Sequence, residues 1–239
     1  MRLYADLAPW YDLIDPRADH ADEAAAYLDA LAAAGLTGGE LLELGAGAGN
    51  NASFMKARFR CVLTDLSPAM LALSSAANPE CEHVLGDMRM LDVGRTFDAV
   101  LVHDAIVYMT SLADLRAVLA NAWRHLRAGG VAVFAPDALR DDFHERTSLL
   151  EGEADGRAVR GLAWCYDPEP GDTTCVTDYV FMLRAGGSVT MVHDHHVEGL
   201  FTRAEWDALL AEVGFEVATA SRPGDDDHPD LVFVVRRPG

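Results

Sequence analysis

Short apolar runs alternate with longer amphipathic stretches through the first 136 residues of the chain. Each run has the length of a buried β-strand, and a polar or glycine-rich link follows it. Strands that alternate with helices over short links lie parallel, because each crossover returns the chain to the same end of the sheet. The pattern therefore predicts an α/β fold with a doubly wound sheet. The predicted strands span 41–44, 61–65, 83–85, 97–102 and 131–134.

Helix signals separate these strands. Asn50 or Asn51 is expected to cap the helix after the first strand, because an asparagine side chain can accept the free amides of a first turn. Ser67 followed by Pro68 has the cap-then-proline pattern of a second helix. An amphipathic stretch over 112–126 predicts a longer helix that leads into the fifth strand.

The pattern changes after about residue 150, where runs rich in β-branched and aromatic residues are joined by tight turns. Strands joined in this way cannot be parallel, so an antiparallel insertion is predicted at about 150–200. A helix then follows, with Thr202 as its cap and Gly214 just past its end. The predicted elements are strands 159–166, 174–183, 189–196, 215–220 and 231–235, and a helix over 203–213.

The composition suits one soluble domain over 1–239, and the charge excludes one class of partner. The 19 basic and 38 acidic residues give a net charge of −19. Nucleic acids bind basic side chains that displace counterions, so neither DNA nor RNA is expected as a partner. No apolar stretch is long enough to span a membrane and no signal-peptide pattern begins the chain, so a cytoplasmic protein without membrane contact is expected.

Two features could suggest a metal, and neither has the spacing of metal ligands. The cysteines Cys61, Cys81, Cys165 and Cys175 contain no CxxC pair, so they predict neither a zinc ribbon nor a disulfide framework. Aspartates crowd the link 224–230, but it lacks the ordered spacing of a calcium-binding loop, and a solvated loop is favoured. No metal cofactor is therefore expected.

A glycine-rich turn follows the first strand, where open α/β sheets bind their ligands. It spans 43–49 and reads ELGAGAG, and its glycines let the backbone approach a ligand closely. By itself such a turn suits a dinucleotide, a flavin or no ligand at all. The dinucleotide spacing G-x-G-x-x-G fails at Asn50 when counted from Gly45, and counted from Gly47 it reaches Ala52 inside the helix.

Two carboxylates follow the glycine turn at positions that suit a nucleoside. Asp65 ends the second strand, 20 residues after Gly45, where an acid can accept both ribose hydroxyl protons. Asp87, on the loop after the third strand, would face an adenine amino group. Leu66 and Met88 would supply apolar contacts on either side of the base.

The glycine turn, Asp65 and Asp87, taken in this order along the chain, resemble the motifs of the class I S-adenosylmethionine-dependent methyltransferases. The turn over 43–49 looks like the glycine-rich first motif of that family, and Asp65 and Asp87 look like its ribose and adenine contacts. Segments 102–105 and 126–130 look like the end of its fourth strand and its turn into the fifth. The resemblance implies a Rossmann-like, seven-stranded sheet in the order 3-2-1-4-5-7-6, with the seventh strand antiparallel.

The resemblance also implies S-adenosyl-L-methionine as the cofactor. Carbonyls near Gly45 and His103 would take its ammonium group, and Glu43 would add a negative field. This cofactor carries a sulfonium and an ammonium against one carboxylate and has no phosphate, so the missing dinucleotide glycine is no obstacle. The implied cofactor-binding residues are Glu43, Gly45, Ala46, Gly47, Asp65, Leu66, Asp87, Met88 and His103.

Three features resemble a subgroup of that family that includes sugar-amine N,N-dimethyltransferases. They are residues 10–12 with the helix that follows them, the insertion after the fifth strand, and residues 194–201 near the end of that insertion. In that subgroup an N-terminal segment, here 1–35, closes over the cofactor, and an insertion, here about 150–200, covers the acceptor. By resemblance Tyr11 would touch the methionine end of the cofactor or the methyl-transfer point, and His196 would contact the acceptor. His103 is the third catalytic candidate.

An amine must be neutral to attack a methyl group, so a general base near the acceptor is useful. Candidate bases are His103 with Asp104 at the end of the fourth strand, and the histidines within 193–196. Strand alternation places neighbouring members of that run on opposite faces, which makes it a poor metal site. The aromatic residues that could wall the acceptor cavity are Tyr4, Trp10, Tyr11, Trp164 and Tyr166.

We therefore expect an enzyme that transfers a methyl group to a small-molecule acceptor, with N-methylation of an amine slightly favoured over O-methylation. A carboxyl O-methyltransferase would need Arg89, Arg140 or Arg160 in the cavity. An NAD(P)-dependent oxidoreductase would place a pyrophosphate on the helix at Asn50. A non-catalytic cofactor-binding protein is a third alternative, and the sequence leaves a homodimer open.

Overall fold

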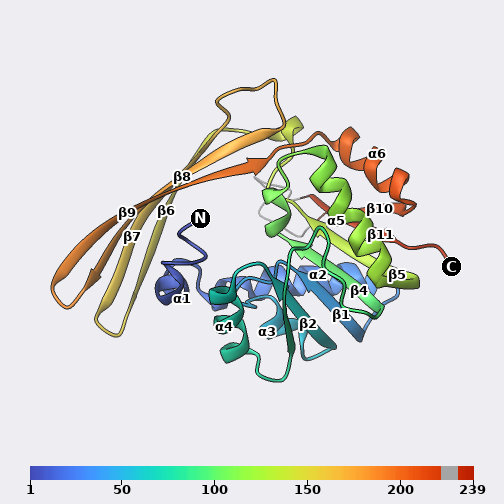
Figure 1. Ribbon diagram of the computed structural model, residues 1–239, viewed down its shortest axis with the longest axis horizontal. Helices are drawn as coiled ribbons and strands as arrows, with labels where there is room; N and C mark the ends of the chain where they lie inside the picture. Colours follow the sequence, from blue (N-terminus) through green and yellow to red (C-terminus); the bar gives the residue numbers. More distant parts are fainter. Residues whose placement is uncertain (222–230) are drawn as a thin grey trace.

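The computed structural model describes residues 1–221 and 231–239 and contains two β-sheets. The larger sheet lies among the helices, and the smaller one extends away from it as a long twisted arm (Figure 1). The aspartate-rich link 224–230 lies outside the described residues. The larger sheet comprises β1 (Gly39–Leu44), β2 (Phe59–Asp65), β3 (Glu82–Leu85), β4 (Phe97–His103), β5 (Leu126–Ala135), β10 (Glu216–Ser221) and β11 (Leu231–Arg236).

The strand order of the larger sheet is β10-β11-β5-β4-β1-β2-β3. The first five strands pair in parallel, and β11 runs antiparallel to both β5 and β10. Numbered from the opposite edge, this is the order 3-2-1-4-5-7-6, so the predicted α/β fold is confirmed. The fifth strand begins at Leu126, earlier than the sequence pattern indicated.

Helices cover both faces of the larger sheet because its strand residues alternate between two apolar cores. Leu41 of β1 packs with α2 and α3, whereas the adjacent Leu42 packs with α5 and α6. None of the described helices has the length and apolarity needed to cross a membrane. The α-helices are α1 (Tyr11–Ile14), α2 (Ala21–Ala33), α3 (Ala52–Met55), α4 (Pro68–Ala77), α5 (Leu112–His125) and α6 (Arg203–Val213), and the 3-10 helices are η1 (Ala8–Trp10), η2 (Arg17–His20), η3 (Ala105–Tyr108) and η4 (Arg140–Asp142).

Two of the three predicted helix caps are confirmed. The Ser67 hydroxyl accepts an amide of α4, and Thr202 forms a capping box at α6, which ends at Gly214 in the left-handed region with φ 103°. The asparagine cap of α3 is wrong. Asn51 stands at the cap position, but its side chain makes no capping hydrogen bond, and its amide nitrogen donates to Glu23 Oε2 at 2.9 Å.

The arm is a four-stranded antiparallel sheet whose strands follow sequence order. Its three predicted strands are confirmed, but a fourth, the edge strand β6, was missed. Nearly all side chains of β6 are exposed, so it carries no apolar alternation from which to predict a strand. The arm consists of β6 (Arg146–Ala154), β7 (Arg157–Tyr166), β8 (Thr174–Ala185) and β9 (Ser188–Gly199).

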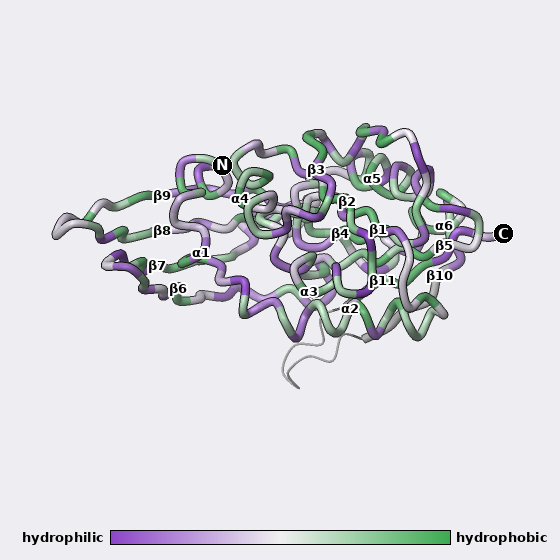
Figure 2. Tube along the Cα trace, turned by 90° about the horizontal axis from the view of Figure 1, so that it is seen from below, coloured by the Kyte–Doolittle hydropathy of each residue, from purple (hydrophilic) through white to green (hydrophobic). Residues whose placement is uncertain are grey.

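The base of the arm packs on the N-terminal segment, with α1 against β6 and β7 (Figure 2). Leu3, Leu7 and Leu13 form a small apolar core with arm residues such as Phe181. Gly152 permits the closest approach, because a Cβ there would lie 2.1 Å from the Leu13 carbonyl oxygen. The N-terminal segment is therefore held between the arm and the larger sheet.

Candidate functional site

A cavity of about 560 Å³ opens where β1, β2 and β4 end, within the usual size range of small-molecule sites. Its walls come from the turn after β1, from the loops after β2, β3 and β4, and from the N-terminal segment. The structure brings together along this cavity all of the residues predicted to bind the cofactor, namely Glu43, Gly45, Ala46, Gly47, Asp65, Leu66, Asp87, Met88 and His103.

The glycine turn adopts a backbone that side chains would disturb. Gly45, Gly47 and Gly49 have φ values of 76°, 55° and 72°, in the left-handed region that favours glycine. A Cβ on Gly45 would lie 2.3 Å from the Ala105 Cβ, whereas a Cβ on Gly47 would meet nothing within 4 Å. Gly47 therefore leaves open space at the cavity wall, where a ligand can lie against the backbone.

Glu43 places a buried carboxylate at the floor of the cavity. The residue is 3% exposed, and its Oε2 has no hydrogen-bond partner among the described residues. Burial raises the pKa of this carboxyl group to about 7. An unpartnered buried carboxylate favours a cationic ligand and opposes a phosphate, so this floor fits the sulfonium and ammonium groups of S-adenosylmethionine.

Asp65 is fixed by the backbone around it. Its Oδ2 accepts the Gly47 amide at 2.9 Å and its Oδ1 accepts the Ser67 amide at 2.7 Å. Each carboxylate oxygen has a further lone pair, so both can still accept a ribose hydroxyl. Burial raises the pKa of Asp65 even though the backbone hydrogen bonds lower it.

The end of the cavity beside Asp87 and Met88 is more open. Asp87 accepts Arg89 Nη2 at 2.6 Å, and Arg89 also bonds to Asp114 at 2.8 Å. This hydrogen bonding by Arg89 holds the pKa of Asp87 below its usual range. The Met88 amide donates to no acceptor within residues 1–221 and 231–239, and Leu66, which lines the same cavity, is 67% exposed. An amide donor and an apolar surface are thus available to a base.

His103 belongs to an ionic cluster that is only partly buried. Its Nε2 lies 2.6 Å from Asp104 Oδ1 and 3.0 Å from Glu23 Oε2, while Asn51 Nδ2 lies 3.2 Å from its Nδ1. Burial by itself lowers the pKa of His103, but the carboxylates of Asp104 and Glu23 outweigh it and raise the pKa well above 6.5. A histidine that stays protonated at neutral pH is a poor general base, so the geometry favours an electrostatic role.

The N-terminal segment reaches the glycine turn through Asp15. His20 Nε2 lies 2.8 Å from Asp15 Oδ1, and Asn50 Nδ2 donates to Asp15 Oδ2 at 3.2 Å. Burial lowers the pKa of His20, but the hydrogen bonds to Asp15 and Glu23 raise it to about 10. A carboxylate therefore stands beside Asn50, where the oxidoreductase alternative needs a pyrophosphate, and like charges disfavour that ligand.

A chain of hydrogen bonds connects the arm to the outer part of the cavity. Tyr4 Oη and Tyr108 Oη are 2.8 Å apart, and Tyr108 Oη lies 2.9 Å from His196 Nδ1. His196 Nε2 in turn lies 3.0 Å from Asp194 Oδ2. Tyr4, Tyr108 and Tyr11 line the cavity, whereas the fully buried His196 lies behind Tyr108. His196 can thus act on a bound acceptor only through Tyr108.

The sequence analysis missed Tyr108, whose only signal is an aromatic ring shortly after the fourth strand. Of the other aromatic candidates, Trp10 packs on Arg157. Trp164 is 42% exposed, and its ring centroid lies 4.4 Å from that of Tyr166. These three rings do not line the cavity, because period-2 alternation directs Trp164 and Tyr166 to the exposed face of the arm.

Known proteins match both the sequence and the fold. Residues 41–130 match a family model described as a methyltransferase domain. A relative from Saccharopolyspora spinosa, named dTDP-4-amino-2,3,4,6-tetradeoxy-D-glucose N,N-dimethyltransferase, is 32% identical over 180 residues, covering 73% of this chain and 70% of the relative. The chain belongs to the class I S-adenosylmethionine-dependent methyltransferases.

Solved structures agree with this assignment. The methyltransferase aligns with CalS10, an amino pentose methyltransferase from Micromonospora echinaspora with bound S-adenosylmethionine, at 28% identity and a TM-score of 0.78 over 91% of both chains. It aligns with DesVI of Streptomyces venezuelae at 25% identity and a TM-score of 0.85, covering 99% of this chain and 98% of the other. The cofactor of this methyltransferase is S-adenosylmethionine, which supplies a methyl group activated by its sulfonium.

Proposed function

We propose that this methyltransferase methylates the amino group of a deoxyamino sugar. The observation that carries the proposal is the outer wall of the cavity, where Tyr4, Tyr11 and Tyr108 stand beside the carboxylate of Asp104. Hydroxyl and carboxylate oxygens bind an amine and a polyhydroxylated ring, and aromatic faces cover the apolar side of a sugar. Matched relatives are named as N,N-dimethyltransferases of dTDP-linked amino sugars.

The hydrogen-bond chain from the arm determines what Tyr4 presents to the acceptor. Burial lowers the pKa of His196 despite the nearby Asp194, so His196 is neutral at neutral pH. With its Nε2 proton donated to Asp194, its Nδ1 accepts from Tyr108, and the Tyr108 oxygen then accepts from Tyr4. The lone pairs of the Tyr4 oxygen are left to accept an amine N–H, which orients the nitrogen for in-line attack.

A carboxylate acceptor is disfavoured by the arrangement of the arginines. Arg89 reaches the cavity, but Asp87 and Asp114 both bind its guanidinium group. Arg140 donates to a backbone carbonyl, and Arg160 lies among carbonyls and glutamates of the arm. Of the three arginines that could bind a carboxylate, Arg89 is ion-paired, and Arg140 and Arg160 do not line the cavity. This supports N-methylation over carboxyl O-methylation.

The test is a methyl-transfer assay on matched acceptors. The panel contains dTDP-linked 3-amino and 4-amino deoxy sugars, the corresponding phosphate-free glycosides, and analogues with hydroxyl or carboxylate in place of the amine. Mass spectrometry is expected to show one or two added methyl groups on the amino sugars only. Comparison of the dTDP-linked amino sugars with the phosphate-free glycosides then shows whether the acceptor is nucleotide-linked or a finished glycoside. Transfer confined to the hydroxyl or carboxylate analogues would overturn the proposal.

A further inference from the structure

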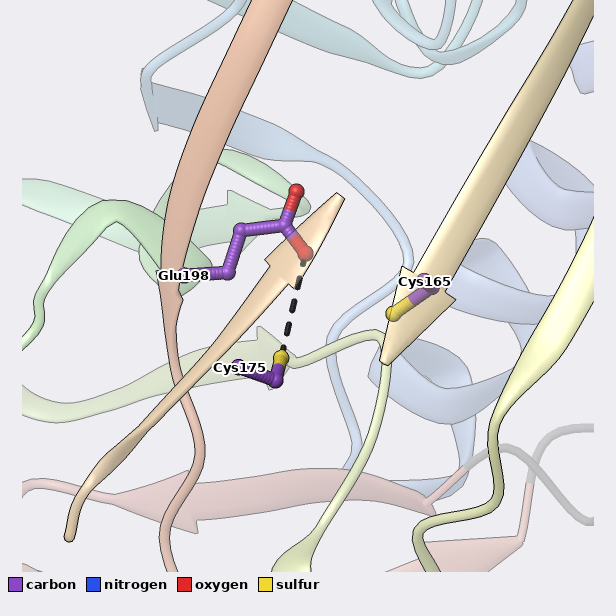
Figure 3. A group of neighbouring side chains, drawn as sticks. All are labelled: Cys165, Cys175 and Glu198. Carbon is purple, nitrogen blue, oxygen red and sulfur yellow. Dashed lines mark hydrogen bonds between the residues drawn. The ribbon is translucent and has the colours of Figure 1, made fainter. Parts of the chain in front are cut away.

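Three side chains with metal-binding atoms converge where the arm joins the larger sheet. Cys165 lies near the end of β7, Cys175 near the start of β8 and Glu198 near the end of β9, and their side chains point toward one another (Figure 3). The two sulfur atoms and a carboxylate oxygen all lie within 4.8 Å of one another. Cys175 Sγ lies 4.0 Å from Glu198 Oε2.

The cluster is buried and has room beside it. Cys165, Cys175 and Glu198 are each less than one-tenth exposed. A small cavity of about 10 Å³ lies against all three, and Asp137 and Arg146 also line it. That volume holds about one water-sized sphere, which is also enough space for a single ion. The methyl-transfer site described above uses none of these five residues.

We propose that Cys165, Cys175 and Glu198 bind a zinc ion. Zinc takes thiolate sulfur at about 2.3 Å and carboxylate oxygen at about 2.1 Å in tetrahedral geometry, which spaces the donor atoms about 3.6–3.8 Å apart. The observed spacing needs only a small closure to reach these values. Two soft sulfur donors select zinc over magnesium or calcium, which take oxygen ligands. The small cavity leaves the fourth position to a water molecule or to Asp137.

The strand register explains why an ion suits this pair better than a disulfide. Cys165 lies directly opposite Thr177, so Cys175 is its diagonal neighbour on the adjacent strand. Diagonal neighbours in a sheet lie about 7–8 Å apart, with their Cβ atoms somewhat closer, whereas a disulfide needs Cβ atoms about 3.5–4.5 Å apart. An ion spans that gap, because it adds two metal–sulfur bonds between the cysteines.

The site would join three strands of the arm to the loop that carries Tyr108. Val107 lines the same small cavity as the cluster. Gly199, next to Glu198, lies so close to the same loop that a Cβ there would be 2.0 Å from the Met109 carbonyl oxygen. We therefore expect zinc to stabilise the attachment of the arm and to take no part in methyl transfer.

The test is a metal titration of the full-length, reduced protein after treatment with a chelator. Cobalt(II) is expected to bind at about one equivalent and to give thiolate-to-cobalt charge-transfer absorption, which zinc then abolishes. That absorption separates the site from the cluster Glu23, His103 and Asp104, which has no sulfur. Cys165→Ser and Cys175→Ser should each weaken zinc binding by at least about 100-fold, above the range typical of an outer-shell partner.

Cys81→Ser is the matched control. Cys61 and Cys81 are the other two free cysteines, and neither belongs to a metal-binding cluster within the described residues. The control should keep wild-type zinc affinity. Should the cysteine variants fail to fold, Glu198→Gln provides the same test while retaining both thiols. A wild-type protein that shows no thiolate–cobalt band, or that binds zinc no more tightly than Glu198→Gln, would overturn the proposal.

Discussion

The cofactor end and the acceptor end of the cavity are built in different ways. The cofactor end consists of residues that directly follow parallel strands, such as Gly45 after β1 and His103 at the end of β4. The acceptor end depends on contacts between distant parts of the chain. For example, the Leu3 amide donates a hydrogen bond to Asp194, 191 positions away. A parallel sheet brings its strand ends together by itself, whereas the acceptor end also needs the N-terminal segment, which packs on the arm.

The difference predicts that the two ends can be damaged separately. The cofactor end depends on local backbone geometry in the glycine turn. The acceptor end depends on two close approaches of the arm, Gly152 to Leu13 and Gly199 to Met109. Substitutions in the turn should abolish cofactor binding, while substitutions at the arm contacts should leave it intact and impair use of the acceptor.

The largest effect is expected from Gly45→Val. Its side chain would overlap Ala105, and the φ of 76° is unfavourable for any branched residue, so calorimetry should show cofactor affinity lowered by at least about 100-fold. Gly94→Ala is the control, because Gly94 has a φ of 73° and open space around its Cβ position. Wild-type affinity in Gly45→Val would contradict the placement of the cofactor along the turn.

Asp65→Ala is expected to weaken cofactor binding by about 2–4 kcal/mol. The variant loses two charge-assisted hydrogen bonds to the ribose, and water replaces them only in part. Asp65 also accepts the amides of Gly47 and Ser67, so thermal unfolding must be measured alongside affinity. Asp65→Asn, which keeps one acceptor oxygen, should lie between wild type and alanine. A folded alanine variant with unchanged affinity would refute the ribose contact.

Gly199→Ala should affect the other end of the cavity. A Cβ there would displace β9 from the Met109 carbonyl, and a displacement of about 1 Å is enough to lower kcat/KM for the acceptor by about 10–100-fold. Cofactor affinity should stay at its wild-type value. Gly171→Ala, at a position with open space, is the matched control. Equal losses for cofactor and acceptor would show that the two ends are not independent.

The pH dependence of cofactor binding should report Glu43. A cationic cofactor binds more tightly to the ionised carboxylate of Glu43. Because the pKa of Glu43 is about 7 in the free enzyme, the carboxyl group is mostly protonated below pH 7 and must lose its proton when the cofactor binds. Affinity should rise about tenfold from pH 6 to pH 8. The free enzyme should lose stability over the range from pH 4.5 to about 7, because its folded state holds the proton more tightly than the unfolded chain. Glu43→Gln should flatten both profiles.

The smallest effect is expected from Tyr108→Phe. The variant loses the hydroxyl between Tyr4 and His196, and a neutral hydrogen bond of about 0.5–1.5 kcal/mol corresponds to a fall in kcat of about 2–12-fold. His196→Ala should lower kcat similarly, and the double variant should be no slower than the worse single one, since both break the same chain. Additive losses in steady-state assays would show that His196 acts independently of Tyr108.

The elements that the sequence predicted well are those whose own residues carry the signal. The buried strands β1, β2 and β4 are short apolar runs, and α6 has both Thr202 at its start and Gly214 at its end. The edge strand β6 lacked such a pattern because its side chains are mostly exposed. Asn51 has the residue type of a helix cap, but the distant carboxylate of Glu23 binds its side chain instead.

The residue pattern determined the parallel strands and placed the glycine turn, Asp65 and Asp87 at one edge of the sheet, because hydrophobic periodicity defines the strands and a parallel sheet brings the residues after them together. The family resemblance supplied the other predicted cofactor-binding residues. Only the tertiary structure decided the approach of Glu23 from α2 to His103 and the route from His196 to the cavity through Tyr108. Both depend on distances between residues far apart in the chain, and no local pattern encodes those distances.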